Sequence, residues 1–358
     1  MMELMASAPG KLVLLGEYAV LEGAPALAVA VDRRATVRIT ARTDGVCVVN
    51  APDLGVFNAR MPIDVDGRPR WQWAEADAAK LQLVDHVWRA LALEGMAPSR
   101  GDGFCMDLDT AGFFETNGSG LAKLGLGSSA ALTVALASAL AVFAGHAEVV
   151  ADRLQWLHCL FRMHSSWQDG RGSGVDLATS VAGGLINYRL TGSEPQPSFT
   201  LLDWPMADVH CLFVWSGQSV STADFLRRLA HWRLGHHAEY AAHMQNLGEL
   251  AEAGAELWQE GRGADFVAMV AAYATALENF GIACGLEIFS AAQKRLAQLA
   301  AQNGVSYKPC GAGGDFGAVF AQDSARLARI ERSILAEGLH CVPLAVDPQG
   351  AYCVKFAT

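Results

Sequence analysis

The chain carries little charge and lacks the patterns that mark several classes of protein. Charged residues make up 18% of its 358 residues, no extended run of Lys and Arg occurs, and the formal net charge is −10. Proteins that bind nucleic acid generally present a basic face, so we expect no nucleic-acid partner. An anionic small-molecule substrate would need a locally positive site, which directs attention to the few basic residues beside glycine-rich turns.

The sequence also lacks C-x-x-C motifs, a recognisable signal peptide and an apolar run long enough to span a membrane. Eight cysteines are scattered without a C-x-x-C motif, which suits neither a zinc site nor a disulfide framework. The opening residues MMELMASAPGK lack the basic and apolar regions of a signal peptide. The longest apolar run, residues 130–144, is shorter than the roughly 20 residues that span a bilayer. We therefore expect a reduced, cytoplasmic protein that has no membrane partner.

Apolar residues are abundant, at 52% of the chain, and their spacing indicates a mixture of strands and helices. Stretches rich in Val, Thr and Ile predict strands at 10–20, 25–41, 102–110 and 208–217. Helical periodicity predicts helices at 74–95, 128–145, 151–167 and 324–337, and two or three more before residue 302. Because no regular β-α-β alternation occurs, an α+β fold is expected. The Gly-, Ser- and Pro-containing stretch 190–200 is the expected linker between two domains.

The stretch AKLGLGSSAALTVALA, residues 122–137, joins a lysine, a glycine-rich turn and two serines to an apolar helix. Glycine lets the backbone turn closely around a ligand, and the N-terminus of a helix favours an anion. Ser128 and Ser129 can cap the helix, or a hydroxyl can ligate Mg²⁺. Lys123 precedes the glycines, unlike the lysine of the G-x-x-x-x-G-K-[ST] motif. The stretch predicts a phosphate-binding loop, with a purely structural helix start as the alternative.

Three further stretches place polar residues beside glycine turns. In SAPGKLVLLGEYAV, residues 7–20, Lys11 follows a Pro-Gly turn, where it either serves the structure or reaches a phosphate as a point charge. In KPCGAGGDFGAVF, residues 308–320, the glycines form either an elaborate turn or a phosphate cradle. In HSSWQDGRGSGVDLATSVAGG, residues 164–184, Asp176 follows a Gly-Ser-Gly turn. This aspartate either caps a helix or contacts a reacting group.

Together and in this order, the four stretches resemble the motifs of the GHMP kinase family. Residues 7–20 resemble its N-terminal motif, residues 122–137 its ATP phosphate-binding loop, and residues 308–320 its C-terminal glycine-rich motif. The resemblance implies a two-domain α+β fold. It implies an N-terminal domain like domain 2 of ribosomal protein S5 in residues 1–190, and a C-terminal ferredoxin-like α/β sandwich in residues 200–358.

Details of the motifs resemble the phosphomevalonate kinase branch more than the mevalonate kinase branch of this family. The first motif reads GEY where mevalonate kinases usually read GEH, and Lys123 stands where they tend to have proline. Mevalonate kinases carry a glutamate, a Mg²⁺ ligand, eleven residues before the catalytic aspartate, and Ser165 occupies that position here. His164 and Gln168 resemble the H-x-x-x-Q-G-x-x-G-S-G-x-D pattern of phosphomevalonate kinases, although Asp169 occupies the glycine position after Gln168.

The resemblance implies transfer of a phosphoryl group from ATP, with Mg²⁺, to an anionic small molecule, phosphomevalonate first, in isoprenoid precursor synthesis. The implied catalytic residues are Lys11, Lys123 and Asp176. The implied ATP-binding residues are Gly125, Leu126, Gly127, Ser128, Ser129 and Ala130, of which Ser129 also ligates the metal. The implied acceptor-binding residues are Glu17, Tyr18, His164, Gln168, Arg171, Ser173, Gly174, Ser221, Thr222, Gly311, Ala312, Gly313, Gly314 and Asp315.

Two alternatives stay open at this point. A mevalonate kinase, or another member with a hydroxyl acceptor, would use Asp176 as a base. A phosphate acceptor needs no such base, because its second pKa of about 6 leaves it ionised near neutral pH, but it needs lysines against charge repulsion. The other alternative is a GHMP-fold protein that senses a ligand without catalysis, against which Lys11, Ser129 and Asp176 argue. A monomer and a homodimer are both compatible with the sequence.

Overall fold

The structure is a computed structural model that describes residues 2–63, 75–99, 101–117, 120–167, 172–192, 196–217 and 222–356. Within these residues, eight strands form the larger sheet. Its main path runs through β14 (Tyr352–Phe356), β1 (Glu3–Leu15), β2 (Ala26–Arg42), β5 (Gly103–Asp109), β3 (Cys47–Ala51) and β4 (Val56–Arg60). Off this path, β2 also pairs with β8 (Leu185–Thr191), and β8 pairs with β9 (Gln196–Leu202).

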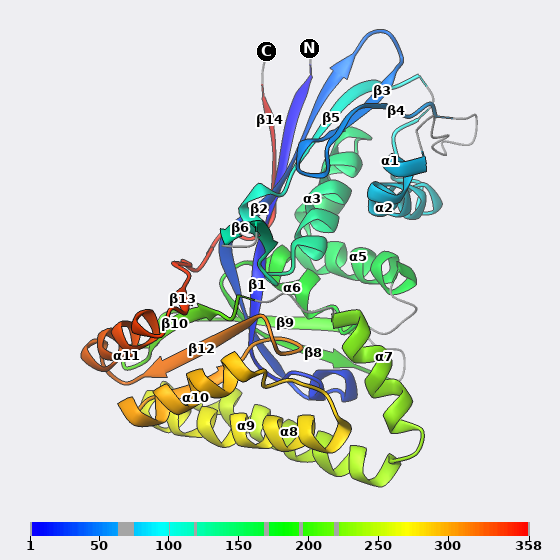
Figure 1. Cartoon of the computed structure of the whole chain (residues 1–358). Coiled ribbons are helices and arrows are strands. Elements are labelled where there is room, and N and C mark those ends of the chain that lie inside the picture. Colours follow the sequence, from blue (N-terminus) through cyan, green and yellow to red (C-terminus); the bar gives the residue numbers. More distant parts are fainter. Residues whose placement is uncertain are drawn as a thin grey trace.

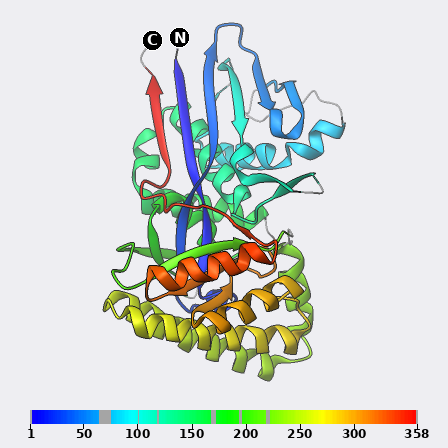
Figure 2. The ribbon, with the colours of Figure 1, turned by 60° about the vertical axis from the view of Figure 1, so that its left-hand side comes forward.

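The two ends of the described chain meet in this sheet. β14 pairs antiparallel with β1, with Glu3 opposite Phe356, and both ends lie together at the top of the molecule (Figures 1 and 2). β1 and β2 are long strands that continue from this end into the other half of the molecule (Figure 1). The first motif therefore lies on a strand that is shared by both halves.

Helices cover one face of the larger sheet (Figure 1). They are α1 (Glu75–Lys80), α2 (Gln82–Leu93), α3 (Ser128–Phe143), α4 (Ala147–Ala151), α5 (Arg153–Trp167) and α6 (Val175–Ala182). α3 packs against β1 and β2, and α6 packs against α3 and β1. Most residues of α3 are buried on all sides, as expected for a helix that is apolar all round. The apolar run that follows the two serines is therefore a central core helix.

The other half is built on a second, antiparallel sheet in the order β11-β12-β10-β13. Its strands are β10 (His210–Trp215), β11 (Ser306–Pro309), β12 (Phe316–Ala321) and β13 (His340–Cys341). Its helices are α7 (Thr222–Arg233), α8 (His237–Gln259), α9 (Gly263–Cys284), α10 (Ala291–Asn303) and α11 (Ser324–Ala336). The helices α8, α9 and α10 form the bottom layer in Figure 1.

Short elements complete the described chain. Three single turns of 3₁₀ helix are η1 (Ala19–Glu22), η2 (Pro52–Leu54) and η3 (Ala111–Phe113), and a small hairpin joins β6 (Phe114–Asn117) to β7 (Gly120–Lys123). By length and composition, α9 is the helix of the described ranges that could cross a membrane, although 56% of its apolar window is buried inside the protein. It packs against α8 and β11, as a core helix does.

The hydrophobic core lies on both faces of β1, because successive side chains of a strand point in opposite directions. Val13 belongs to the cluster that α3 fills, whereas Leu12 and Leu14 belong to the cluster that contains Phe266 and Tyr273 of α9. Every residue of β1 from Ala6 to Leu15 is buried. A lysine within this strand is therefore enclosed on both sides.

The mixed α+β architecture is confirmed, but the predicted linker is wrong. Residues 196–202 form β9, which pairs with β8 as a hairpin arm. Pro197 is tolerated there because β9 has a partner on one side only within the described residues. β9 begins within the predicted linker and β14 lies in the predicted C-terminal domain, and yet both strands join the larger sheet. The division into residues 1–190 and 200–358 stays a prediction.

Candidate active site

Lys11 lies in the buried strand β1 and meets Asp176 of α6. The Lys11 side chain is 11% exposed, and its Nζ lies 3.5 Å from Asp176 Oδ2. An unpaired charge in such surroundings would be costly, so the carboxylate is the partner that makes the buried lysine tenable. Asp176 stands in the first turn of α6, and its side chain is 40% exposed. The ion pair therefore lies at an opening that a solute can reach.

The glycine-rich turn before α3 packs directly on Lys11. The Lys11 N–H donates to the carbonyl oxygen of Leu126 at 2.8 Å. A Cβ added to Gly127 would lie 3.1 Å from Lys11 Cε, so the lysine stem fills the space that this glycine leaves. Gly127 also has φ of 76°, in the left-handed region that favours glycine. The first two motifs are thus in contact.

The start of α3 differs from the expectation that Ser128 or Ser129 caps this helix. Its N-cap is Gly127, and among the described residues no side chain caps the helix. The suggestion that Ser128 or Ser129 caps it is wrong, because the left-handed Gly127 makes both serines part of the first helical turn. Ser128 is buried and Ser129 is exposed. The first N–H groups of a helix lack partners within the helix, so this end offers unpaired donors together with the exposed Ser129 hydroxyl.

The C-terminal glycine-rich turn contacts the glycine-rich turn before α3. A Cβ added to Gly125 would lie 2.1 Å from Asp315 Oδ2, so the two turns touch. The Tyr18 hydroxyl donates to the carbonyl oxygen of Ala312 at 2.7 Å. The turn contains three left-handed glycines, with φ of 67°, 97° and 89°: Gly311, Gly313 and Gly314. The structure therefore brings the first, second and third motifs together, although they are far apart in the sequence.

Glu17 and Tyr18 of the first motif face the protein interior. Tyr18 has φ of 63° and is buried, with its ring edge against Phe280 at 5.1 Å. Burial raises the pKa of Tyr18 well above its usual range, which keeps its hydroxyl a donor. Glu17 is buried in an ion pair with Lys308, a residue that the sequence reasoning did not single out. The signal for Lys308 was its place at the first position of KPCGAGG.

His164, Ser173 and Gly174 lie around Asp176. Burial lowers the pKa of His164, and the Asp176 charge only partly opposes that shift, so we expect a neutral imidazole at neutral pH. Its Nε2 is buried and has no hydrogen-bond partner among the described residues. The Tyr188 hydroxyl donates to the Ser173 carbonyl oxygen at 2.5 Å, and Gly174 has φ of 76° at the N-cap of α6. These contacts fix the backbone just before α6, and thereby the position of Asp176 in the first turn of that helix.

Five residues of the predicted site are not placed by these contacts. Lys123 is the last residue of β7 and is exposed, and its catalytic role stays a prediction. Gln168, Arg171 and Ser221 lie outside the described residues. Thr222 is the first residue of α7. The remaining predicted residues lie on β1 and the loop that follows it, in the two glycine-rich turns, at the starts of α3 and α6, and, for His164, in the last turn of α5.

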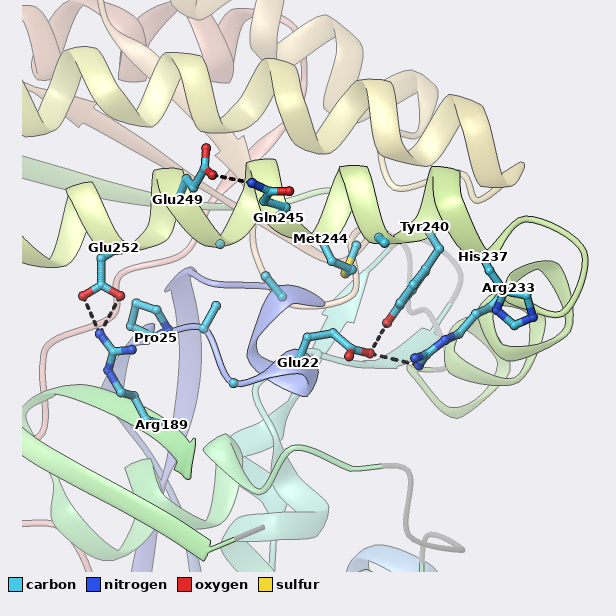
Figure 3. Close-up of a pocket in the computed structure, with 15 residues that line it drawn as sticks. Glu22, Pro25, Arg189, Arg233, His237, Tyr240, Met244, Gln245, Glu249 and Glu252 are labelled. Carbon is cyan, nitrogen blue, oxygen red and sulfur yellow. Dashed lines mark hydrogen bonds and ion pairs between the residues drawn. The ribbon is translucent and has the colours of Figure 1, made fainter. Parts of the chain in front are cut away.

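A separate pocket of about 710 Å³ lies between α8 and the loop after Tyr18 (Figure 3). Glu22 accepts a hydrogen bond from the Tyr240 hydroxyl at 2.6 Å and pairs with Arg233 at 2.9 Å. On the other side of the pocket, Arg189 pairs with Glu252 (Figure 3). None of the predicted site residues lines this pocket. The contacts of Glu22 with Tyr240 and Arg233 hold the segment that follows Glu17 and Tyr18 against α8.

Comparisons with known proteins agree with this geometry. No model of a known protein family matches the chain. The phosphomevalonate kinase of Streptomyces sp. (strain CL190) is 28% identical over 336 residues, which cover 86% of each chain. The mevalonate kinase of Thermococcus gammatolerans is 29% identical over 202 residues, 56% of each chain. The solved structure of Streptococcus pneumoniae phosphomevalonate kinase, in complex with phosphomevalonate and AMPPNP, matches with a TM-score of 0.74 and 17% identity over 96% of this chain and 99% of that chain.

The fold is that of the GHMP kinases, in two domains of mixed α+β structure, as the motifs implied. The sequence similarity confirms the resemblance to this family. The sequence similarity extends to both phosphomevalonate kinases and mevalonate kinases. The choice between the two acceptors must therefore rest on the residues of the site.

Proposed function

We propose that the chain is an ATP-dependent kinase that converts phosphomevalonate to diphosphomevalonate. The observation that carries the proposal is the Lys11–Asp176 ion pair, 3.5 Å long, beside the glycine-rich turn and the start of α3. A cation held at this point lies between the proposed phosphate-binding turn and an opening to solvent. The similarity to a phosphomevalonate kinase over 86% of the chain supports the same assignment.

The proposed chemistry depends on charge and position rather than on a strong base. The second pKa of a phosphate monoester is about 6, so an acceptor of this kind is already ionised near neutral pH. Transfer then requires that two anions be brought together and their repulsion cancelled. Lys11 supplies the positive charge, and Asp176 holds its ammonium group in place. With a hydroxyl acceptor, Asp176 would instead take the proton from the attacking oxygen.

The nucleotide phosphates are assigned to the turn at 125–127 and the first turn of α3. Unpaired N–H groups and the helix dipole favour an anion there. Mg²⁺ usually keeps several waters and is held by few protein oxygens together with substrate phosphates. The exposed Ser129 hydroxyl fits that donor set, and no cluster of His, Cys, Asp and Glu suited to a metal occurs among the described residues. Bound Mg²⁺ would neutralise phosphate charge.

Ser129→Ala should weaken the use of Mg·ATP. Loss of one hydroxyl ligand is expected to raise the Mg²⁺ concentration for half-maximal turnover by about 2- to 10-fold, the range of one lost hydrogen bond. The measurement is ADP release at fixed ATP and increasing Mg²⁺. Ser129→Thr keeps the hydroxyl and serves as the matched control. If the alanine variant keeps the metal dependence of the wild type, Ser129 is only a residue of the helix start.

Lys123→Met should lower turnover with phosphomevalonate by roughly 100-fold, the effect of losing one charged stabilising contact, and should change the KM for ATP little. The physical reason is the loss of one of the two lysines assigned to cancel repulsion between the anions. Lys355→Met, which changes an exposed lysine of β14, is the control. Normal turnover of Lys123→Met would remove this lysine from the mechanism.

A panel of acceptors tests the proposed function. ADP release is coupled to a dehydrogenase reaction and measured with phosphomevalonate, mevalonate, diphosphomevalonate and a set of sugars. We expect the highest kcat/KM with phosphomevalonate. A preference for mevalonate, which the similarity to the mevalonate kinase of Thermococcus gammatolerans also supports, would reassign the acceptor. No turnover with any acceptor, together with ligand-dependent stabilisation, would identify a sensor instead of an enzyme.

A further inference from the structure

An ion pair inside the protein links the first and third motifs. Lys308 Nζ donates to Glu17 Oε1 and to the carbonyl oxygen of Pro309, the latter at 2.6 Å. The Lys308 side chain is 0% exposed and the Glu17 side chain 1% exposed. The two residues are 291 positions apart in the sequence. One belongs to the loop after β1, and the other to β11, just before the C-terminal glycine-rich turn.

Tyr273 of α9 completes the surroundings of this ion pair. Its ring centre lies 5.8 Å from Lys308 Nζ. Its hydroxyl accepts from the Gly16 N–H at 3.0 Å and donates to the Glu17 carbonyl oxygen at 3.3 Å. The Lys308 charge is therefore met by a carboxylate, a carbonyl oxygen and an aromatic face. All of these groups come from the segments that lead into or support the two motifs.

Stability alone does not explain a charged pair at this position. A buried ion pair gains little net free energy, because desolvation of both charges offsets their attraction, and an apolar pair often serves as well. The Glu17 Oε2 atom is moreover buried without a hydrogen-bond partner among the described residues. The pair instead fixes the relative position of the two segments that carry it. A charged, hydrogen-bonded contact has one preferred geometry, whereas an apolar contact has several.

The geometry that the pair fixes is the contact between the two motifs. Glu17 is followed by Tyr18, whose hydroxyl donates to the Ala312 carbonyl oxygen at 2.7 Å. Lys308 is followed by Pro309 and by the turn that contains Ala312. Two connections thus run in parallel between the same two segments, one charged and buried, the other at the glycine-rich turn itself. A shift of Lys308 would move the turn relative to Tyr18.

We propose that Glu17 and Lys308 are a positioning pair that holds the GEY segment and the C-terminal glycine-rich turn in register for acceptor binding. This inference rests on the proposed kinase function. It also changes the role of Glu17, which acts through Lys308 and not by touching the acceptor. The proposed ATP-binding turn touches the C-terminal glycine-rich turn at Gly125 and Asp315, but it is also fixed by the hydrogen bond from the Lys11 N–H to the Leu126 carbonyl oxygen, which does not involve the ion pair. Loss of the pair should therefore affect the acceptor more than ATP.

A double-mutant cycle tests this proposal with Lys308→Met, Glu17→Leu and the double variant, in which both charged groups are replaced by apolar ones. Each single change leaves a buried charge or polar group without its partner, so each should lower the Tm, and the double variant should recover most of that loss. All three variants should raise the KM for the acceptor about tenfold or more, with the KM for ATP within about twofold of the wild type. If a single variant does not fold, the double variant carries the test.

A double variant that recovers both the Tm and the acceptor KM would overturn the proposal, because the pair would then be only structural. Hydrogen exchange of residues 308–316 gives a readout that needs no turnover. Faster exchange there in the double variant supports the positioning role, and unchanged exchange contradicts it. If the wild type phosphorylates no acceptor, the proposed function fails, and the exchange result still decides whether the pair orders the glycine-rich turn.

Discussion

Lys11→Met should lower kcat by roughly 100- to 1,000-fold, the loss found when one preorganised charge-stabilising group is removed from an active site. Lys11 packs on the proposed phosphate-binding turn, since its Cε lies 3.1 Å from the position of a Cβ on Gly127. Methionine keeps the length and the apolar packing of that stem but removes the charge. The KM for ATP should change little, because backbone groups of the turn and of α3 are assigned to the nucleotide.

Stability should not account for this loss. The partner Asp176 is 40% exposed, so water can solvate its carboxylate once the lysine charge is gone, and the Tm should stay close to that of the wild type. Steady-state kinetics and a thermal melt of the same preparation make the measurement. Lys11→Arg is the matched control, since it keeps the charge at a changed position. Lys11→Met with normal kcat would exclude Lys11 from the phosphoryl transfer.

Gly125→Ala should lower kcat/KM by about 100-fold, comparable to the loss of one stabilising contact in the transition state. A Cβ at this position would lie 2.1 Å from Asp315 Oδ2 and 2.7 Å from Asp315 Cβ. Because Asp315 Cβ cannot rotate away, either the ATP-binding turn or the C-terminal glycine-rich turn must move. Both turns would then lose the contact that brings the motifs together at Lys11.

Gly235→Ala is the control for Gly125→Ala. Gly235 has no atom within 4 Å of the position of an added Cβ and has no left-handed φ, so this variant should behave as the wild type. The destabilisation of Gly125→Ala should be modest, at about 1–3 kcal/mol for an overpacked site, and a denaturant titration measures it. Wild-type kcat/KM in a folded Gly125→Ala protein would show that the contact between the two turns is not required.

Much of the fold, and the stretches that meet in the candidate site, could be predicted because the relevant patterns are local. Spacing of apolar residues located most of the helices and strands, and glycine turns next to Lys11 and Asp176 indicated the site. The serine cap was predicted wrongly, because the conformation of Gly127 decides where α3 begins. The linker was predicted wrongly, because β9 is ordered by pairing with β8 and not by its own composition.

Contacts between distant segments were beyond the reach of sequence patterns. Nothing near Glu17 in the sequence indicates that Lys308, 291 positions away, is its partner. Likewise, the pairing of β14 with β1 depends on the path of the whole chain. The register of the first motif against the third is a property of tertiary packing, and it is the part of the site that only the structure supplies.

The identity of the phosphorylated product tests the central claim most directly. Phosphorus NMR of the protein with Mg·ATP and equal amounts of phosphomevalonate and mevalonate shows which acceptor is consumed. We predict that a diphosphate product forms from phosphomevalonate while mevalonate persists, and that Lys11→Met forms neither product at a comparable rate. Formation of a phosphate monoester from mevalonate, with phosphomevalonate left intact, would contradict the account.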